Sequence, residues 1–175
     1  MKTLLGLALL VSLSGPLHAQ KNSDDAERVA NREKMRNALN QVGAKMGIDF
    51  RQSDRQPFNF IGSLESGLRN AESMEVLVMI GTRDVITVQV YPHISGGGYI
   101  NVGRADNGTG LMRKLLGFND GGFFYWGADD VDDVFAAFTF TLESGFPTES
   151  VDIVMRSIPL LDNKVGELSE MVNQK

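Results

Sequence analysis

The chain has 175 residues, a formal net charge of -5 and no cysteine. Its apolar residues, 42% of the total, are enough to form the core of one domain of ordinary size. The negative charge argues against nucleic-acid binding, because that function requires clustered lysine and arginine. Without cysteine the chain can form no disulfide, thiolate metal site or thiol nucleophile.

The first residues have the pattern of a bacterial secretory signal peptide. A basic start precedes an apolar stretch, Leu4–Leu13, and a small residue, Ala19, stands at the expected cleavage position. The apolar stretch is shorter than the roughly 20 residues of a bilayer-spanning helix, so a retained membrane anchor is the less favoured alternative. We therefore predict that residues 1–19 are removed. Residues 20–175 are then a single domain, periplasmic or secreted, without a stable membrane anchor.

The segment from Lys21 to Gly47 is predicted to be a helix, with Asp24 as its N-cap. Four apolar residues recur at helical spacing and predict its buried side: Met35, Leu39, Val42 and Met46. Basic residues lie off that stripe among acidic ones, which indicates a solvated face. The polar residues 49–56 predict a short edge strand or a loop, and the alternation over 58–64 predicts a strand.

The stretch from Met74 to Tyr91 predicts a β-hairpin, because two β-branched runs flank the polar turn 81–84. The first run is almost wholly apolar, so it should be a central strand covered on both faces. The second run alternates and should have one face in water. Pro92 has no N–H for the ladder and should end the second strand. The glycine run Gly96–Gly98 lacks the lysine of a phosphate-binding loop and indicates a flexible surface loop.

A short helix over 111–116 is predicted next, with Thr109 as its cap and Gly117 as its end. The aromatic run Phe123–Trp126 and the strand Val134–Leu142 then predict a second hairpin with an acidic turn. Alternate members of an aromatic run on a hairpin are usually buried and exposed in turn, and the exposed half can bind a partner. The candidate partner-binding residues are Phe124, Tyr125 and Trp126.

The C-terminal segment has the strongest helical periodicity of the mature chain. Its apolar stripe consists of Val151, Val154, Ile158, Leu161, Val165, Leu168 and Val172. Thr148 is the predicted N-cap, and Pro159 should kink or split the helix near Ser157 because it removes one intrahelical hydrogen bond. Together the elements predict an α+β fold, a twisted antiparallel sheet of about five strands with the N- and C-terminal helices packed on it, in the order α-β-β-β-α-β-β-α.

Few residues of the mature chain could perform catalysis. His93 is its one histidine once the predicted signal peptide is removed, and no nucleophile motif accompanies it. We therefore expect a protein that is not an enzyme, with no catalytic residue and no cofactor. The acidic turn could supply oxygen ligands to a metal ion, although a solvated turn explains it as well. These weak metal candidates are Asp129, Asp130, Asp132 and Asp133.

Three short motifs suggest a family. They are Asn107-Gly108-Thr109-Gly110-Leu111 before the short helix, Gly121-Gly122-Phe123-Phe124 with Asp129-Asp130 in the hairpin, and Pro147-Thr148-Glu149 before the long helix. In these motifs, and in its layout from Asp24 to Val172, the chain resembles the YbjN family of bacterial proteins, which share the fold of type III secretion chaperones. The resemblance implies a non-enzymatic domain, a regulator of sensory transduction, that binds extended segments of a partner and often dimerises. The predicted signal peptide sets this chain apart from those chaperones, which act in the cytoplasm.

We therefore expect an exported binding or chaperone-like module that acts through protein–protein interaction. Its partner is a protein of unknown identity, and a homodimer is one expected assembly. The alternative is a small periplasmic metal-dependent hydrolase or ligand-binding protein that uses the acidic turn Asp129–Asp133. A third hypothesis is a structural envelope protein that associates with itself through an exposed strand.

Overall fold

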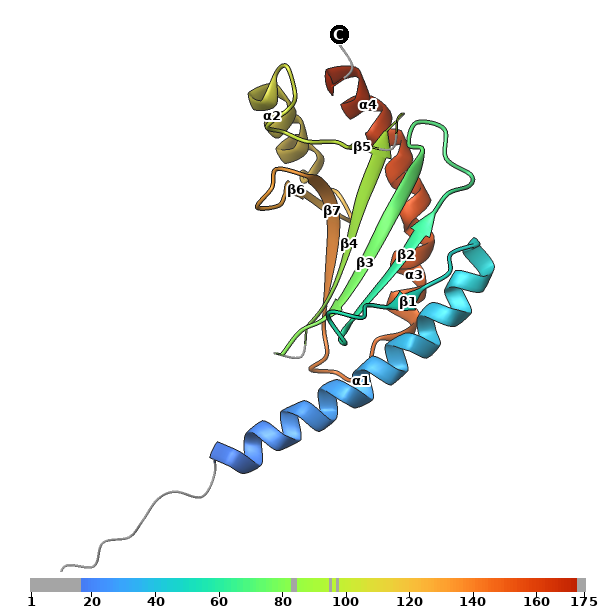
Figure 1. Cartoon of the computed structure of the whole chain (residues 1–175), viewed down its shortest axis with the longest axis vertical. Coiled ribbons are helices and arrows are strands. Elements are labelled where there is room, and N and C mark those ends of the chain that lie inside the picture. The colour runs from blue at the N-terminus through green and yellow to red at the C-terminus, as the bar shows by residue number, and fades with distance from the viewer. Residues whose placement is uncertain (1–16, 83–84, 95, 97, 173–175) are drawn as a thin grey trace, which may run out of the picture.

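The computed structural model describes residues 17–82, 85–94, 96 and 98–172. One antiparallel sheet carries helices on one of its faces (Figure 1), which confirms the predicted α+β class. The helices are α1 (Leu17–Met46), α2 (Gly108–Phe118), α3 (Thr148–Ser157), the 3-10 helix η1 (Ile158–Leu161) and α4 (Asp162–Val172). The strands are β1 (Arg51–Gln52), β2 (Asn59–Leu64), β3 (Ser73–Ile80), β4 (Val85–Ile94), β5 (Gly98–Tyr99), β6 (Tyr125–Ala128) and β7 (Val134–Thr141).

In the described part of the chain the sheet has seven strands rather than about five. Their order is β1-β2-β3-β4-β7-β6, and β5 pairs with β4 outside this path. The two extra strands are the shortest, β1 and β5, with two residues each. None of the helices in the described ranges is long and apolar enough to span a bilayer.

The predicted central hairpin is confirmed. Strands β3 and β4 pair in register from Ser73 with His93 to Ile80 with Ile86, and the Gly81 N–H donates to the Val85 carbonyl at 2.8 Å. Residues 83 and 84 of the predicted turn lie outside the described residues. One face of this hairpin is the centre of the core, since its side chains are at most 2% exposed: Met74, Val76, Val78, Ile80, Ile86, Val88 and Val90.

The opposite face of β3 does not have the helical cover that its apolar run predicted. Glu75, Leu77 and Met79 lie on this face and are half-buried, because the helices pack on the other side of the sheet (Figure 1). The alternation of β4 continues the same uncovered face. The prediction that the first strand is covered on both faces is therefore wrong. We call this side of the sheet the open face.

Pro92 does not end β4, which continues to Ile94. The bond from Gly81 to Val85 places the odd-numbered residues of β4 in hydrogen bonds with β3. Pro92 therefore faces the β7 side, where pairing between β4 and β7 has already ended at Val90. Pro92 lies between that pairing and the pairing of His93 with Tyr99 on β5, so its missing N–H removes no bond of the β4–β7 pairing, and the predicted strand end is wrong.

Helix α1 packs its predicted stripe into the core, with Met35, Leu39 and Val42 no more than 2% exposed. The helix already begins at Leu17, so Asp24 lies within it and is not its N-cap. Residues 1–16, which hold most of the predicted signal peptide, lie outside the described residues.

Arginines of α1 contact the sheet instead of forming a purely solvated face. Arg28 donates two hydrogen bonds to the Ile80 carbonyl, at 3.0 and 2.7 Å, and its guanidinium lies 3.7 Å from the centre of the Phe58 ring. A guanidinium can stack on an aromatic ring while its N–H groups remain available as donors. These contacts hold α1 against the end of the central hairpin.

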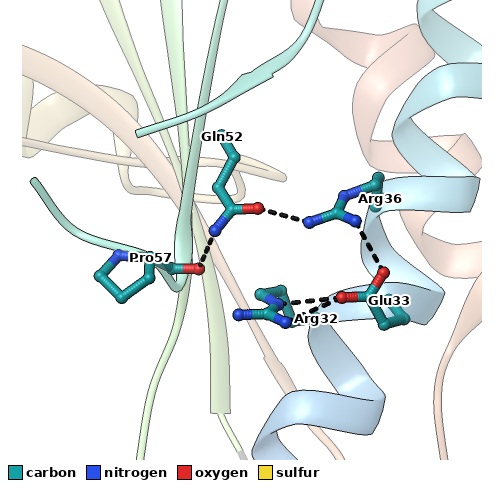
Figure 2. Close-up of polar contacts among 5 residues, drawn as sticks. All are labelled: Arg32, Glu33, Arg36, Gln52 and Pro57. Carbon is teal, nitrogen blue, oxygen red and sulfur yellow. Dashed lines mark hydrogen bonds and ion pairs between the residues drawn. The ribbon is translucent and has the colours of Figure 1, made fainter. Parts of the chain in front are cut away.

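A second arginine cluster joins α1 to the outermost strand (Figure 2). Glu33 pairs with Arg32 at 2.9 Å and with Arg36 at 2.8 Å. Arg36 also donates to the Gln52 side chain on β1, and Gln52 donates to the Pro57 carbonyl at 2.8 Å. The short edge strand is thus held by side chains as well as by its two-residue pairing with β2.

The predicted split of the last helix is confirmed. Helix α3 ends at Ser157, η1 contains Pro159, and α4 begins at Asp162. The stripe from Val151 to Leu168 is buried along all three elements. Thr148 is the first residue of α3, and Pro147 occupies the N-cap without a side-chain hydrogen bond, so the predicted Thr148 cap is wrong.

Helix α2 also differs at both ends from the prediction. Its N-cap is Asn107, whose side-chain oxygen accepts from the Gly110 N–H at 2.8 Å, and the predicted cap Thr109 lies within the helix. Asparagine is a strongly preferred N-cap residue because its side-chain oxygen can accept from a free N–H of the first turn. At the other end the helix continues past Gly117 to Phe118.

The carboxylate of Asp162 joins the C-terminal helices to the loop between β2 and β3. It is 5% exposed and accepts hydrogen bonds from the backbone N–H groups of Arg69 and Ala71, each at 2.8 Å, and of Asn70 at 3.0 Å. The Asn70 side chain adds bonds to the Asp162 carboxylate at 3.2 Å and to its carbonyl at 3.0 Å. Burial alone would raise the pKa of Asp162, but these donors outweigh burial and hold the pKa below its ordinary value.

Asp162→Asn is expected to lower the free energy of unfolding by about 2–3 kcal/mol, because an amide replaces one of the two accepting oxygens with a donor and leaves at least one of the three N–H groups without its acceptor. A carboxyl with a lowered pKa stabilises the fold above its unfolded-state pKa and loses that effect as the pH falls through its folded-state pKa. The variant should therefore also lose part of the acid-side fall in stability. Urea denaturation between neutral and acidic pH measures both effects.

Asp152→Asn is the matched control, because Asp152 pairs with Arg156 at 2.8 Å on the surface. Its effect should stay within about 0.5–1 kcal/mol. Equal losses for the two variants would contradict a special role for Asp162.

Candidate functional site

An apolar groove of about 430 Å³ lies between the second hairpin and the C-terminal helices. Its wall residues come from the end of α2, the start of the second hairpin, α3, η1 and α4. They are Phe118, Gly122, Phe123, Phe124, Trp126, Ile153, Ser157, Leu160, Leu161 and Lys164. The volume falls within the range of ligand-binding clefts in proteins.

Three large apolar side chains of this groove are accessible to solvent. Leu160 is 69% exposed, Phe123 is 51% exposed and Ile153 is 49% exposed. Leu160 lies in the 3-10 turn η1, off the buried stripe to which its neighbours Ile158 and Leu161 belong. The accessible side chains thus surround a groove whose inner wall is already packed.

The inner wall consists of aromatic rings in contact. The Phe118 and Trp126 rings meet edge to face, with centroids 5.4 Å apart, and Phe123 stacks on Phe138 at 4.8 Å. Phe124 and Trp126 are only 4% and 5% exposed. Truncation of such rings would leave cavities in the core as well as alter the groove.

Asn119 fixes α2 against the second hairpin. Its side-chain oxygen accepts from the Trp126 N–H at 2.6 Å, and its amide donates to the Trp126 carbonyl at 3.1 Å. Those two backbone groups belong to the outer edge of β6, where another strand would otherwise pair. Asn119 therefore occupies the outer edge of β6 at Trp126.

Charged side chains border the groove at one end. Glu167 pairs with Lys114 of α2 at 2.6 Å and with Lys164 of α4 at 3.1 Å. The hydrogen bond from Lys114, followed by that from Lys164, holds the pKa of Glu167 below its ordinary value. Lys164 also lies 4.6 Å from the centre of the Phe118 ring. Two lysines share one glutamate here, so this end of the groove has an excess of positive charge.

The structure divides the three predicted partner-binding residues between two faces. Phe124 and Trp126 contribute to the groove wall, whereas Tyr125 is 45% exposed and belongs to the open face. The alternation of buried and exposed aromatic residues is confirmed, but the two residues in the groove are mostly covered.

Sequence reasoning missed the accessible residues Phe123, Ile153 and Leu160. Ile153 and Leu160 are apolar but lie off the buried stripe of an otherwise amphipathic segment. That mismatch was a usable signal, because a large apolar residue on the polar side of a helix often marks a contact surface. Their meeting with Phe123 depends on tertiary structure.

The acidic turn of the second hairpin is held by its own carboxylates. Asp129 accepts from the N–H groups of Val131 at 3.1 Å and Asp133 at 2.9 Å, as a side chain does in an Asx turn. Asp133 accepts from the Asn101 amide at 2.7 Å. Asp130 and Asp132 are exposed. These bonds give Asp129 and Asp133 a structural role in the turn.

A metal site at this turn receives no support from the described residues. No three histidine, aspartate or glutamate side chains among them form a group that could hold a metal ion. His93 lies in β4 with its ring 4.3 Å from that of Tyr99, away from the groove. In the described part of the chain, the groove is therefore the feature best suited to binding.

Comparison of the sequence with protein-family models and with curated proteins finds no match.

Leu160→Ser and Leu161→Ser should have very different effects although the residues are neighbours. Leu161 is 6% exposed, and its loss should lower the free energy of unfolding by about 2–4 kcal/mol. Leu160 is 69% exposed, and its replacement should change the free energy by less than about 0.5 kcal/mol. Thermal or urea denaturation measures the difference, and equal losses would contradict the exposure of Leu160.

Asp129→Ala should lower the free energy of unfolding by about 1–2 kcal/mol, because two N–H groups of the turn lose their acceptor. Asp130→Ala is the control and should change it by less than about 0.5 kcal/mol.

The melting temperature of the wild-type protein should be the same in Ca²⁺, Mg²⁺ and EDTA. A clear upward shift with either ion would restore the metal hypothesis.

Proposed function

We propose that this protein is an exported, non-enzymatic binding module that holds an apolar segment of a partner protein in the groove between the second hairpin and the C-terminal helices. The observation that carries the proposal is the set of accessible side chains, Phe123, Ile153 and Leu160, around a packed aromatic wall. Exposed clusters of large apolar residues on a soluble domain are typical of protein interaction sites.

A protein segment suits this groove better than a small molecule. Small-molecule sites usually bury most of the ligand surface in an enclosed cavity. Here the groove is open, and its apolar residues come from helices and from a hairpin that lie on both sides of it. A segment that lies along the groove could place several apolar side chains between these elements, as in helix-in-groove recognition.

The charged residues beside the groove indicate which residues the partner segment should contain. The excess positive charge of Lys114 and Lys164 at one end of the groove favours a segment with an acidic residue next to its apolar side chains. The proposed partner is therefore a protein segment with two or three large apolar residues and an adjacent aspartate or glutamate.

Two features of the sequence support the wider proposal. The signal-peptide pattern before Ala19 supports export, and cleavage there would remove only the first three residues of the described α1. The resemblance to the YbjN family and to secretion chaperones supports the binding of partner segments without catalysis. Detection of a mature N-terminus at Gln20 in the periplasm would support the first of these features.

The decisive experiment places a photo-crosslinking amino acid at position 123 of the full chain in its host. Mass spectrometry of the product should identify a peptide with the proposed composition. Binding of that synthetic peptide to Phe123→Ser and Leu160→Ser should each be weakened about tenfold, since each variant loses the burial of one large apolar side chain. Isothermal titration measures the loss.

Val131→Ser is the matched control, because Val131 is 63% exposed but lies in the hairpin turn away from the groove. It should bind the peptide as the wild-type chain does. Unchanged binding by Phe123→Ser and Leu160→Ser would overturn the groove as the site. Crosslinks only to lipid, or only to a second copy of this chain, would overturn the proposal that the groove binds a segment of a partner protein.

A further inference from the structure

The open face contains a second hollow, of about 230 Å³, on the side of the sheet opposite the groove. Strands β3 and β4 provide its floor, and β5 and the acidic turn provide its sides. Its lining consists of Glu75, Leu77, Tyr91, Tyr99, Asp129 and Asp133. The hollow thus combines three carboxylates with two aromatic walls, and we call it the acidic hollow.

The aromatic walls belong to a row of rings that crosses the open face. Neighbouring ring centroids are 6.3 Å apart between Tyr125 and Phe135, 5.8 Å between Phe135 and Tyr91, and 5.9 Å between Tyr91 and Tyr99. Such a row is a large, rigid contact area that a partner can cover at little cost in conformational entropy. The helices pack on the other side of the sheet (Figure 1), so this row has no helical cover.

The charge of the hollow is largely uncompensated. Asp133 pairs with Arg104 at 3.5 Å, and the Arg104 side chain is 71% exposed. Within the described ranges, no lysine or arginine lies within ion-pair distance of Glu75 or Asp129. The hollow therefore has a negative potential that favours the entry of a cation.

Burial and this negative potential raise the pKa of the two tyrosines. Burial raises the pKa of Tyr91 to about 12, and the negative charges of Asp129, Asp133 and Glu75 add to the rise because a phenolate would be a further anion. Burial and then Glu75 raise the pKa of Tyr99 in the same way. Both hydroxyls stay protonated at neutral pH, so the walls remain neutral rings that can face a cation.

The side chains and the volume of the hollow favour an organic cation. The described residues hold no group of three acidic or histidine side chains arranged for a metal ion, so an organic cation suits the hollow better. A guanidinium is planar, stacks on tyrosine rings and donates forked hydrogen bonds to carboxylates. A hollow of about 230 Å³ has room for one such side chain and not for a large ligand.

We propose that the open face docks a second protein segment by receiving one of its arginine side chains in the acidic hollow, between Tyr91 and Tyr99 and against Glu75. The aromatic row beside the hollow contacts the neighbouring residues of the same segment. This site does not depend on the groove, because it lies on the other face of the sheet and takes a basic rather than an apolar and acidic segment.

The test uses the folded, isotope-labelled protein and a capped pentapeptide with one central arginine among glycines. Titration should shift the backbone amide signals around Glu75, Tyr91 and Tyr99 in a saturable manner. The same peptide with citrulline, which has the shape of arginine without its charge, should bind about tenfold more weakly or not at all. Equal binding of the two peptides would overturn the proposal, as would shifts confined to the groove.

Glu75→Gln should weaken binding of the arginine peptide about threefold to fivefold, the loss expected for one partly screened charge pair. Glu143→Gln is the matched control, since Glu143 is exposed at the far end of β7. Circular dichroism should show that both variants are folded. Equal affinities of Glu75→Gln and the wild-type protein would overturn the role of Glu75. Free arginine amide that binds as tightly as the peptide would overturn docking of a protein segment.

Discussion

The sheet is covered by helices on one face only, and the other features of the molecule depend on this constraint. The covered face can be wholly apolar, and Val76, Val78 and Val88 on it are fully buried. The open face must meet water and still stabilise the strands, so β3 and β4 carry half-buried polar, aromatic and aliphatic residues on it. One-sided cover therefore produces two different surfaces on one sheet, an apolar groove along the helical side and an acidic, aromatic hollow on the other.

Three features of the chain hold the walls of the groove in place. Pro159 breaks the C-terminal helix between α3 and α4, and the Asp162 carboxylate holds α4 against the loop before β3. Asn119 holds α2 against β6 through both backbone groups of Trp126. Asp162 and Asn119 each satisfy backbone groups that burial would otherwise leave without partners. The accessible side chains of the groove thus rest on a rigid frame, which lowers the entropic cost of binding.

The acidic turn shows how the same side chains can have structural and electrostatic effects. Asp129 and Asp133 accept hydrogen bonds that shape the turn between β6 and β7. Because the turn folds over the end of the open face, their charges also act on Tyr91 and Tyr99. The acidic turn, which the sequence offers only as a weak metal candidate, lines a negatively charged hollow in the structure. The difference lies in the side chains of Glu75 and the tyrosines, which come from distant strands.

The elements whose signals are local could be predicted from the amino-acid sequence alone. Periodicity predicted the buried stripes of α1 and of the C-terminal helices, and Pro159 predicted the break after Ser157. β-branched runs around a polar turn predicted the first hairpin, and an aromatic run, an acidic turn and an alternating strand predicted the second. The tertiary structure decided which face of the sheet the helices cover, and therefore that β3 is open on one side and that β4 can continue through Pro92. It also decided the sites, since Phe123 and Leu160 line one groove, and Glu75 and Asp129 line one hollow, only in the folded chain. Local patterns are encoded within a few residues, whereas a site depends on contacts between segments that are distant in sequence.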